Sequence, residues 1–225
     1  STFGPEYLRP AAANAVVVDS VIRPAVEALQ PSNEGFVLAY ARDSIREPLL
    51  ACLHRLDRRG VVYGAPPDEC RGRLEARPLS PDFVHDLARC ACVVSTAGHQ
   101  LISEAYCLGK PMLAIPEPGQ YEQYINAFYL DKVGGGRRCD LTSLSTRLVQ
   151  DFVDSAAPRP RRAARGAEEV TKILRTQLQA TPAPESRLRL EPATGVARAF
   201  LSAANRAVRK ARLTRTLTPR EDVLA

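Results

Sequence analysis

Residues 90–127 read CACVVSTAGHQLISEAYCLGKPMLAIPEPGQYEQYINA, and this stretch alternates between two kinds of apolar pattern. The runs CACVVS and MLAIP are continuous apolar segments of strand length, which is typical of strands buried on both faces of a parallel sheet. Each run is followed by a helical pattern, over residues 100–108 before Gly109 and over residues 121–130 before the glycines at 134–136. The stretch therefore predicts two consecutive strand–helix units.

The alternation continues toward the N-terminus. Short strands are predicted at residues 15–18, 35–41 (GFVLAYA) and 60–64 (GVVYG). A helix is predicted after the second of these, because Ser44 and Glu47 form a capping-box pattern. Its apolar positions recur at helical spacing: Ile45, Leu49, Leu50, Leu53 and Leu56.

A further helix is predicted from residue 80, where Ser80, Pro81 and Asp82 supply an N-cap, a first-turn proline and an acid at the positive end of the helix dipole. Strands that alternate with helices at this spacing imply right-handed crossovers. The sequence thus predicts an α/β fold with a Rossmann-like, doubly wound parallel sheet.

The remaining chain divides into three expected parts: a linker at residues 1–14, the α/β domain at residues 15–179, and a helical or partly disordered basic tail at residues 180–225. Helices are expected at residues 143–153 and 161–178 on the outside of the sheet. In the tail, residues 194–213 form an amphipathic segment, which is interpreted either as a packed surface helix or as a helix on an anionic membrane face.

The charge is distributed unevenly along the chain. Residues 1–154 hold 16 Lys and Arg against 19 Asp and Glu, whereas residues 155–225 hold 15 against 6. The basic tail could therefore contact anionic lipid or nucleic acid, or form a solvated end. No run of about 18 apolar residues is present, which argues against a membrane span, and no secretory signal pattern is seen.

Six cysteines occur without a C-x-x-C pair and with only three histidines. We interpret them as buried free thiols of a cytoplasmic protein and expect no structural metal.

The turns that follow the two strands of the opening stretch are rich in polar residues. In doubly wound folds, ligands bind beyond the carboxyl ends of the strands. Gly98 lets the backbone approach a ligand closely, and the helix start beside it offers unpaired N–H groups, which suits a phosphate. His99 could donate as a neutral imidazole or simply cap the turn.

Glu104 lies on the helix after this turn among apolar residues, so its carboxylate needs donors. A ribose diol would supply two, and capping of a neighbouring loop is the structural alternative. The second turn supplies amides and an acid, which suit sugar hydroxyls, although on spacing alone they could form an ordinary polar loop. These residues are Gln120, Glu122, Gln123 and Asn126.

Residues 95–136, STAGHQLISEAYCLGKPMLAIPEPGQYEQYINAFYLDKVGGG, resemble the C-terminal, nucleotide-sugar-binding half of GT-B glycosyltransferases. The likeness is to the peptidoglycan N-acetylglucosaminyltransferase family and related uncharacterised glycosyltransferase-like proteins. Their pattern runs S-x-G-G-x-x-x-x-x-E-A-x-x-x-G-K-P, then E-Q-x-x-N-A and a short glycine-rich turn. The resemblance covers about residues 16–142. Two positions depart from the pattern: Ala97 replaces the first paired glycine, and YARDS at residues 40–44 replaces a glycine-rich turn.

The resemblance assigns expected roles to the candidate residues. Gly98 and His99 would face the donor diphosphate beside Ala97, and Glu104 would face the ribose. The base would pack against Pro78 and Leu79. The polar residues of the second turn would surround the phosphates or the donor sugar: Gln120, Glu122, Gln123 and Asn126.

The resemblance also implies an activity. The chain would be the donor-binding half of a glycosyltransferase that moves a sugar from a nucleoside diphosphate, with UDP favoured, to a sugar or lipid-linked acceptor hydroxyl. We expect no cofactor or metal, since no Asp-x-Asp occurs, and we expect the catalytic base to come from an N-terminal domain absent from this chain. The basic tail would allow peripheral contact with the inner face of the membrane. The alternatives are a non-catalytic nucleotide-sugar-binding or regulatory module, a nucleotide-sugar 2-epimerase-like protein, and a nucleic-acid-binding protein.

Overall fold

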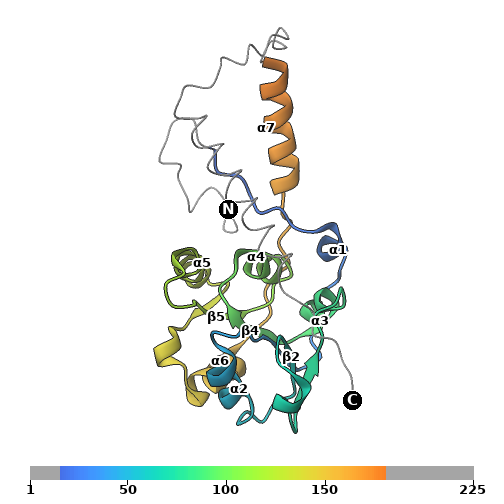
Figure 1. Cartoon of the computed structure of the whole chain (residues 1–225). Helices are drawn as coiled ribbons and strands as arrows, with labels where there is room; N and C mark the ends of the chain where they lie inside the picture. The colour runs from blue at the N-terminus through green and yellow to red at the C-terminus, as the bar shows by residue number, and fades with distance from the viewer. Residues whose placement is uncertain (1–15, 181–225) are drawn as a thin grey trace, which may run out of the picture. The chain divides into compact units, whose positions relative to one another are not determined.

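The computed structural model describes residues 16–180 and contains a six-stranded, all-parallel sheet (Figure 1). The strands lie in the order β3-β2-β1-β4-β5-β6. Their bounds are β1 Val37–Tyr40, β2 Gly60–Tyr63, β3 Leu74–Arg77, β4 Cys92–Thr96, β5 Met112–Ile115 and β6 Gly136–Arg138. The chain winds outward from β1 in one direction and then from β4 in the other, so the order reverses between β1 and β4. This confirms the predicted doubly wound sheet and gives it the order expected for the Rossmann arrangement.

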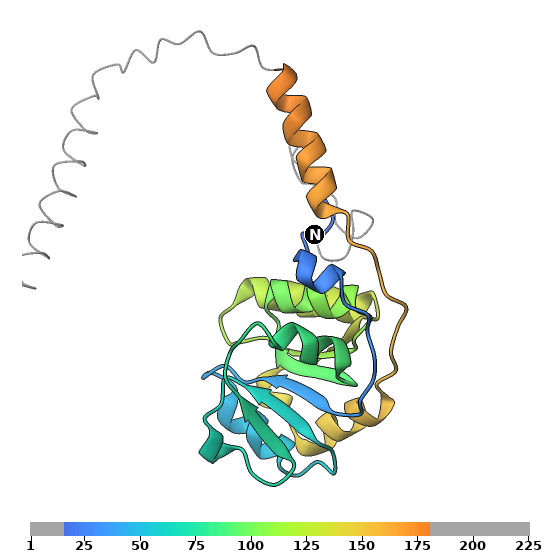
Figure 2. The same ribbon diagram turned by 90° about the vertical axis from the view of Figure 1, so that its right-hand side faces the viewer.

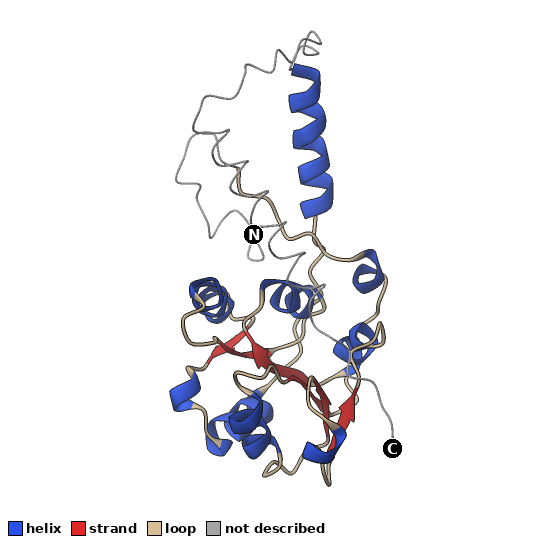
Figure 3. Ribbon diagram, in the orientation of Figure 1, coloured by secondary structure: helices blue, strands red, loops and turns tan. Residues whose placement is uncertain are grey.

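Helices cover both faces of the sheet (Figures 2 and 3). One face packs against α1 (Pro24–Glu27), α3 (Phe83–Arg89), α4 (His99–Cys107) and α5 (Tyr121–Lys132). The other packs against α2 (Arg46–Leu53) and α6 (Thr146–Ser155). The remaining helical elements are α7 (Gly166–Ala180) and the short 3-10 turns η1 (Pro67–Glu69) and η2 (Leu141–Ser143).

Alternate residues of the central strands enter the two apolar layers. In β4, Val93 belongs to the α3–α4–α5 layer, whereas Cys92 and Val94 belong to the α2–α6 layer. All three are 0% exposed. Burial on both faces explains why these strands are continuous apolar runs rather than alternating ones.

Several local predictions were wrong. Residues 16–18 form no strand. The Ser44–Glu47 capping box does not form either: the N-cap of α2 is Ile45, without a side-chain cap, and the Ser44 hydroxyl donates to Glu117 instead. Two strands were not predicted, β3 with sequence LEAR and β6 with sequence GRR. Both are edge strands, and their charged residues gave no apolar run to recognise.

The helix predicted at residues 161–178 forms as α7 but starts at Gly166, and between residues 167 and 177 none of its side chains is buried. The expected packing on the outside of the sheet was therefore wrong for residues 167–177, whereas Ala164, before the helix, packs against the core. The chain divides into two compact units, residues 1–177 and 178–225. The predicted linker at 1–14, most of the predicted tail at 180–225 and the amphipathic segment at 194–213 lie outside the described residues.

All six cysteines are free thiols, and all but the partly buried Cys70 are buried. The prediction of buried free thiols is therefore confirmed for every cysteine except Cys70. Burial raises the pKa of the Cys92 thiol to about 12 and that of Cys90 further. Within residues 16–180, no cluster of His, Cys, Asp and Glu is arranged to hold a metal ion. Of the described helices, none combines the length and the apolar character that crossing a bilayer requires.

Candidate functional site

The carboxyl ends of β1, β4 and β5 lie side by side, because β4 pairs with β1 on one side and with β5 on the other. Ser95 in β4 is in register with Tyr40 in β1, and its hydroxyl donates to the Tyr40 carbonyl at 3.1 Å. The loops that follow these strands therefore leave the sheet at the point where the strand order reverses. Open α/β sheets bind ligands at such a point.

The structure brings together the two polar turns identified in the sequence. The Asn126 side-chain amide, in α5, donates to the Ala97 carbonyl at 3.1 Å. Ala97 itself is buried in the α3–α4–α5 layer. Its methyl group thus packs in the apolar core, and its backbone carbonyl takes part in the contact between the two turns.

Gly98 is the N-cap of α4, with φ −65° and ψ 136°. Any residue can adopt this conformation, and a Cβ added to Gly98 would meet no atom of the described chain within 4 Å. Neither the backbone nor the packing requires glycine here. The space that the described residues leave in front of the turn is therefore available to a ligand. It lies next to the N-terminus of α4, whose first N–H groups have no acceptor within the helix.

His99 begins α4 and counts among the exposed residues. The atoms around the ring nevertheless desolvate it enough to lower its pKa, while the Glu122 carboxylate acts in the opposite direction. The neutral imidazole is the form favoured at neutral pH, and it can donate one hydrogen bond.

Glu104 is buried, with 1% of its surface exposed, and its donors come from the protein. Arg23 binds both carboxylate oxygens, through Nε at 2.6 Å and Nη2 at 2.7 Å, and the Gln100 amide donates to Oε1 at 2.7 Å. The hydrogen bond to Glu104 raises the pKa of Arg23. Sequence analysis missed Arg23, because no local pattern connects residues 81 positions apart.

Two of the amides predicted to bind the sugar form hydrogen bonds within the protein instead. Gln123 accepts from the Glu117 backbone N–H at 3.0 Å and donates to the Glu117 carboxylate at 2.6 Å. Asn126 contacts Glu122 at 3.2 Å in addition to Ala97. Both amides are buried, whereas Gln120 and Glu122 are exposed. The latter pair stays accessible to a ligand.

A second group at the same edge was not among the predicted site residues. The Glu117 carboxylate accepts from the Ser44 hydroxyl and from Gln123, and lies 3.5 Å from the Arg42 guanidinium. Burial raises the pKa of Glu117, but these hydrogen bonds and the Arg42 charge outweigh it, so the pKa is lowered overall. A cavity of about 430 Å³ lies beside this group. It is lined by Tyr40, Ala41, Arg42, Asp43, Ser44, Gly64 and Glu117.

Pro78 and Leu79 follow β3 and are exposed, Leu79 to 65%. The loop that contains them leads into α3, whose first residue, Phe83, packs edge-on against Tyr40 at 6.3 Å and Tyr63 at 4.9 Å between ring centroids. The aromatic contacts place the start of α3 against the last residues of β1 and β2.

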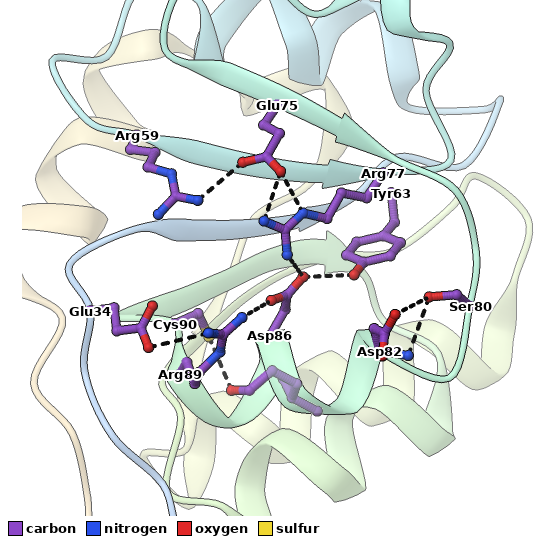
Figure 4. A network of polar contacts seen from close by, with 11 residues as sticks. Glu34, Arg59, Tyr63, Glu75, Arg77, Ser80, Asp82, Asp86, Arg89 and Cys90 are labelled. Atoms are coloured by element: carbon purple, nitrogen blue, oxygen red, sulfur yellow. Dashed lines mark hydrogen bonds and ion pairs between the residues drawn. The ribbon is translucent and has the colours of Figure 1, made fainter.

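A buried polar network fixes both ends of this loop (Figure 4). Asp86 in α3 is 1% exposed and accepts from the Tyr63 hydroxyl at 2.6 Å, from Arg89 at 2.7 Å and from Arg77. Burial raises the pKa of Asp86, but the donors prevail and lower it. Burial, with help from Asp86, raises the pKa of Tyr63 to about 12. The network ties the end of β3 to β2 and α3.

Comparison with known proteins finds glycosyl transferases both among family models and among curated relatives. A family model described as "Glycosyl transferase family 1" matches residues 4–157. A UDP-N-acetylglucosamine–N-acetylmuramyl-(pentapeptide) pyrophosphoryl-undecaprenol N-acetylglucosamine transferase from Bradyrhizobium diazoefficiens is 26% identical over 159 residues, which cover 67% of this chain and 40% of the relative. A protein with the same description from Methylorubrum extorquens is 30% identical over 107 residues, covering 46% of this chain and 29% of the relative.

Among solved structures, Acinetobacter baumannii MurG superposes with a TM-score of 0.50 at 12% identity, over 73% of this chain and 58% of that chain. This likeness is one of fold. The chain spans 40% or less of the length of these curated relatives.

Proposed function

The chain belongs to glycosyl transferase family 1, and from this premise we propose that it is the donor-binding half of a metal-independent glycosyltransferase. The donor would be a nucleoside-diphosphate sugar. The relatives' description as UDP-N-acetylglucosamine transferases supports UDP as the nucleotide. The same description supports a lipid-linked acceptor, and with it a cytoplasmic protein that works at the inner face of the membrane.

The observation that carries the proposal is the junction of the two polar turns at the reversal of strand order. The hydrogen bond from Asn126 to Ala97 holds them together, and the open space before Gly98 lies beside the N-terminus of α4. A helix N-terminus presents N–H donors and a partial positive charge, which favour a diphosphate. The fold itself gives no reason for glycine at this position.

The parts of the donor would be distributed along this edge. The diphosphate would lie against Gly98 and His99, with Gln120 and Glu122 within reach of the phosphates or the sugar. The exposed Leu79 side chain, with Pro78, would receive the base. Gln123 and Asn126 would hold the second turn in place.

Glu104 would bind the ribose. A carboxylate has about four acceptor positions, and the contacts with Arg23 and Gln100 use three of them. Because Glu104 is 1% exposed, a ribose hydroxyl would reach the remaining position, on Oε2, only if Arg23 withdrew. The expected two-hydroxyl contact would likewise require Arg23 to leave the carboxylate.

In the transfer reaction, the leaving nucleoside diphosphate gains negative charge. Fixed N–H groups at the start of α4 would stabilise that charge without reorganisation. The base that deprotonates the acceptor hydroxyl would come from the other half of the enzyme. A non-catalytic nucleotide-sugar-binding module would use the same edge of the sheet and differ only in lacking transfer.

A nucleotide panel tests the proposal. The melting temperature of the 225-residue chain is measured with UDP, GDP and TDP and with their sugar conjugates. A ligand at 100 times its Kd stabilises the folded state by about 2.7 kcal/mol, which for a domain of this size raises the melting temperature by about 5–10 °C. A clear shift with one nucleotide supports the proposal, and no shift with any of them contradicts it. Sugar transfer by the protein that contains both halves then separates an enzyme from a binding module.

A further inference from the structure

The β3–α3 connection (residues 78–82) contains the two residues that the proposed function assigns to the base. Pro78 and Leu79 are exposed, and they belong to neither apolar layer of the domain. Packing therefore does not fix their position. The strand before them is an edge strand, which only β2 holds in the sheet. The contacts at the two ends of the connection must therefore decide where these residues lie.

The end of the connection that enters α3 is fixed close to the candidate site. The ring of Phe83, the first residue of α3, packs edge-on against Tyr40 at the end of β1, with 6.3 Å between the ring centroids. The carbonyl of Tyr40 accepts from Ser95 in β4, the strand that leads into the Gly98 turn. The connection therefore ends beside the strands on which the proposed donor site is built.

The other end of the connection is held by the side chain of Arg77, the last residue of β3 (Figure 4). Arg77 is in register with Tyr63 in β2, so the two side chains leave the sheet on the same face. They converge on one atom, Oδ2 of Asp86 in α3, to which both donate. Asp86 is 1% exposed, which keeps water from competing for this contact. The contact therefore ties the residue before Pro78 to α3.

The Arg77 guanidinium is engaged within the protein and not offered to a ligand. Its Nε donates to Glu75 at 2.7 Å, and its Nη1 donates to Asp86. These contacts belong to a chain of ion pairs in which three arginines face three acids: Glu34, Arg89, Asp86, Arg77, Glu75 and Arg59. Such a chain has no excess positive charge to attract a phosphate. Arg77 can therefore influence a bound nucleotide only through the connection that it anchors.

Arg89 provides a comparison within the same network. It donates to the other oxygen of Asp86, Oδ1, at 2.7 Å. It lies at the C-terminal end of α3, however, and its second partner is Glu34, which is no part of the connection. Both arginines thus satisfy the same buried carboxylate, and of the two only Arg77 adjoins the residues assigned to the base.

We propose that Arg77 is a positioning residue that determines base selectivity: by tying the end of β3 to Asp86, it sets the place of Pro78 and Leu79, against which the base of the donor packs. The inference rests on the proposed function and makes it more specific. UDP and GDP share the ribose and the diphosphate and differ in the size and edge of the base. A displaced connection should therefore change the discrimination between them.

The test measures the affinities of the 225-residue chain for UDP and GDP by calorimetric titration in wild type, Arg77→Met and Arg89→Met. Wild type should bind UDP more tightly. Arg77→Met is expected to reduce the ratio of the two dissociation constants at least roughly 5-fold, because a hydrogen bond to a charged group contributes enough for a change of about 10-fold or more. Arg89→Met removes a donor from the same carboxylate and should keep the ratio within about twofold of wild type.

The outcomes separate the two proposals. If Arg77→Met and Arg89→Met change the ratio equally, or neither changes it, the positioning role is wrong while the donor-binding function stands. Equal affinities of the wild-type chain for UDP and GDP overturn the role in the same way. If Arg77→Met is unfolded without ligand, Arg77→Lys is compared with Arg89→Lys, since both keep the charge but donate from a single nitrogen, and equal ratios overturn the role. If the wild-type chain binds neither nucleotide, the proposed function fails and this inference with it.

Discussion

Replacing Arg23 by methionine is expected to destabilise the domain strongly, although more than half of the arginine side chain is exposed. The substitution leaves the Glu104 carboxylate, 1% exposed, with Gln100 as its remaining donor among the contacts described above. Water cannot easily replace the lost guanidinium at so buried a carboxylate. The effect should therefore come from desolvated charge rather than from lost surface contact.

The stability lost in Arg23→Met can be estimated from the exposure of the Arg23 and Glu104 side chains. Removing one partner of a fully buried ion pair costs about 3–5 kcal/mol, whereas exposed pairs contribute at most about 1 kcal/mol. Here the side chains of Arg23 and Glu104 are 53% and 1% exposed. We expect an intermediate loss of about 2–3 kcal/mol, which lowers the melting temperature of a domain of this size by about 4–12 °C.

Denaturant unfolding of a double-mutant cycle measures this loss. The cycle comprises Arg23→Met, Glu104→Met and the double variant, with Arg55→Met as a control at an exposed arginine after α2. The double variant should recover most of the loss, since apolar residues that replace both partners leave no buried charge. A coupling free energy below about 0.5 kcal/mol, or equal losses for Arg23→Met and the control, would refute the reasoning.

Three further predictions concern the core and the buried network. The pKa of Asp86 is lowered in the folded protein. The contribution of Asp86 to stability is therefore present above its unfolded pKa of about 4, and it is lost as the pH falls through the folded pKa. Asp86→Asn should flatten the acid limb of a curve of unfolding free energy against pH, and an unchanged acid limb would contradict the network. The pKa of Tyr63 is raised to about 12. Its contribution to the free energy of unfolding, up to about 3 kcal/mol, is therefore present below the unfolded pKa of about 10 and is lost as the pH rises toward 12. For Tyr63→Phe, chemical denaturation should show a smaller loss of stability at alkaline pH than for wild type. At Gly136, a Cβ would lie 1.9 Å from the Met112 carbonyl oxygen, so Gly136→Ala should cost about 1–3 kcal/mol or more in the same assay, and a neutral result would contradict the packing of β6 on β5.

The central sheet could be predicted from the sequence because burial on both faces makes each strand an apolar run. GFVLAYA and CACVVS were recognised for that reason and became β1 and β4. The edge strands could not be recognised, because each pairs on one side only and carries charged residues such as Glu75 and Arg137.

The meeting of the two polar turns could also be predicted, since parallel strands end at one edge of the sheet and the turns that follow them lie there. The side-chain partners within the candidate site could not. Arg23 and Glu104 are 81 residues apart, and Ser44 and Glu117 are 73 apart. Ser44 fitted a capping box by spacing, but the ion-pair group around Glu117 offered its hydroxyl a charged acceptor.

The most direct test of the central claim is the nucleotide affinity of Gly98→Val. Valine is compatible with the backbone angles of this turn, and its side chain would enter open space. The melting temperature should therefore stay within about 2 °C of wild type. Ala51→Val, on the exposed side of α2, serves as a control that introduces the same side chain away from the turn. If a nucleoside diphosphate binds against this turn, its affinity should fall at least roughly 10-fold in Gly98→Val and stay unchanged in the control. Equal affinity in all three proteins would contradict the placement of the diphosphate at the start of α4.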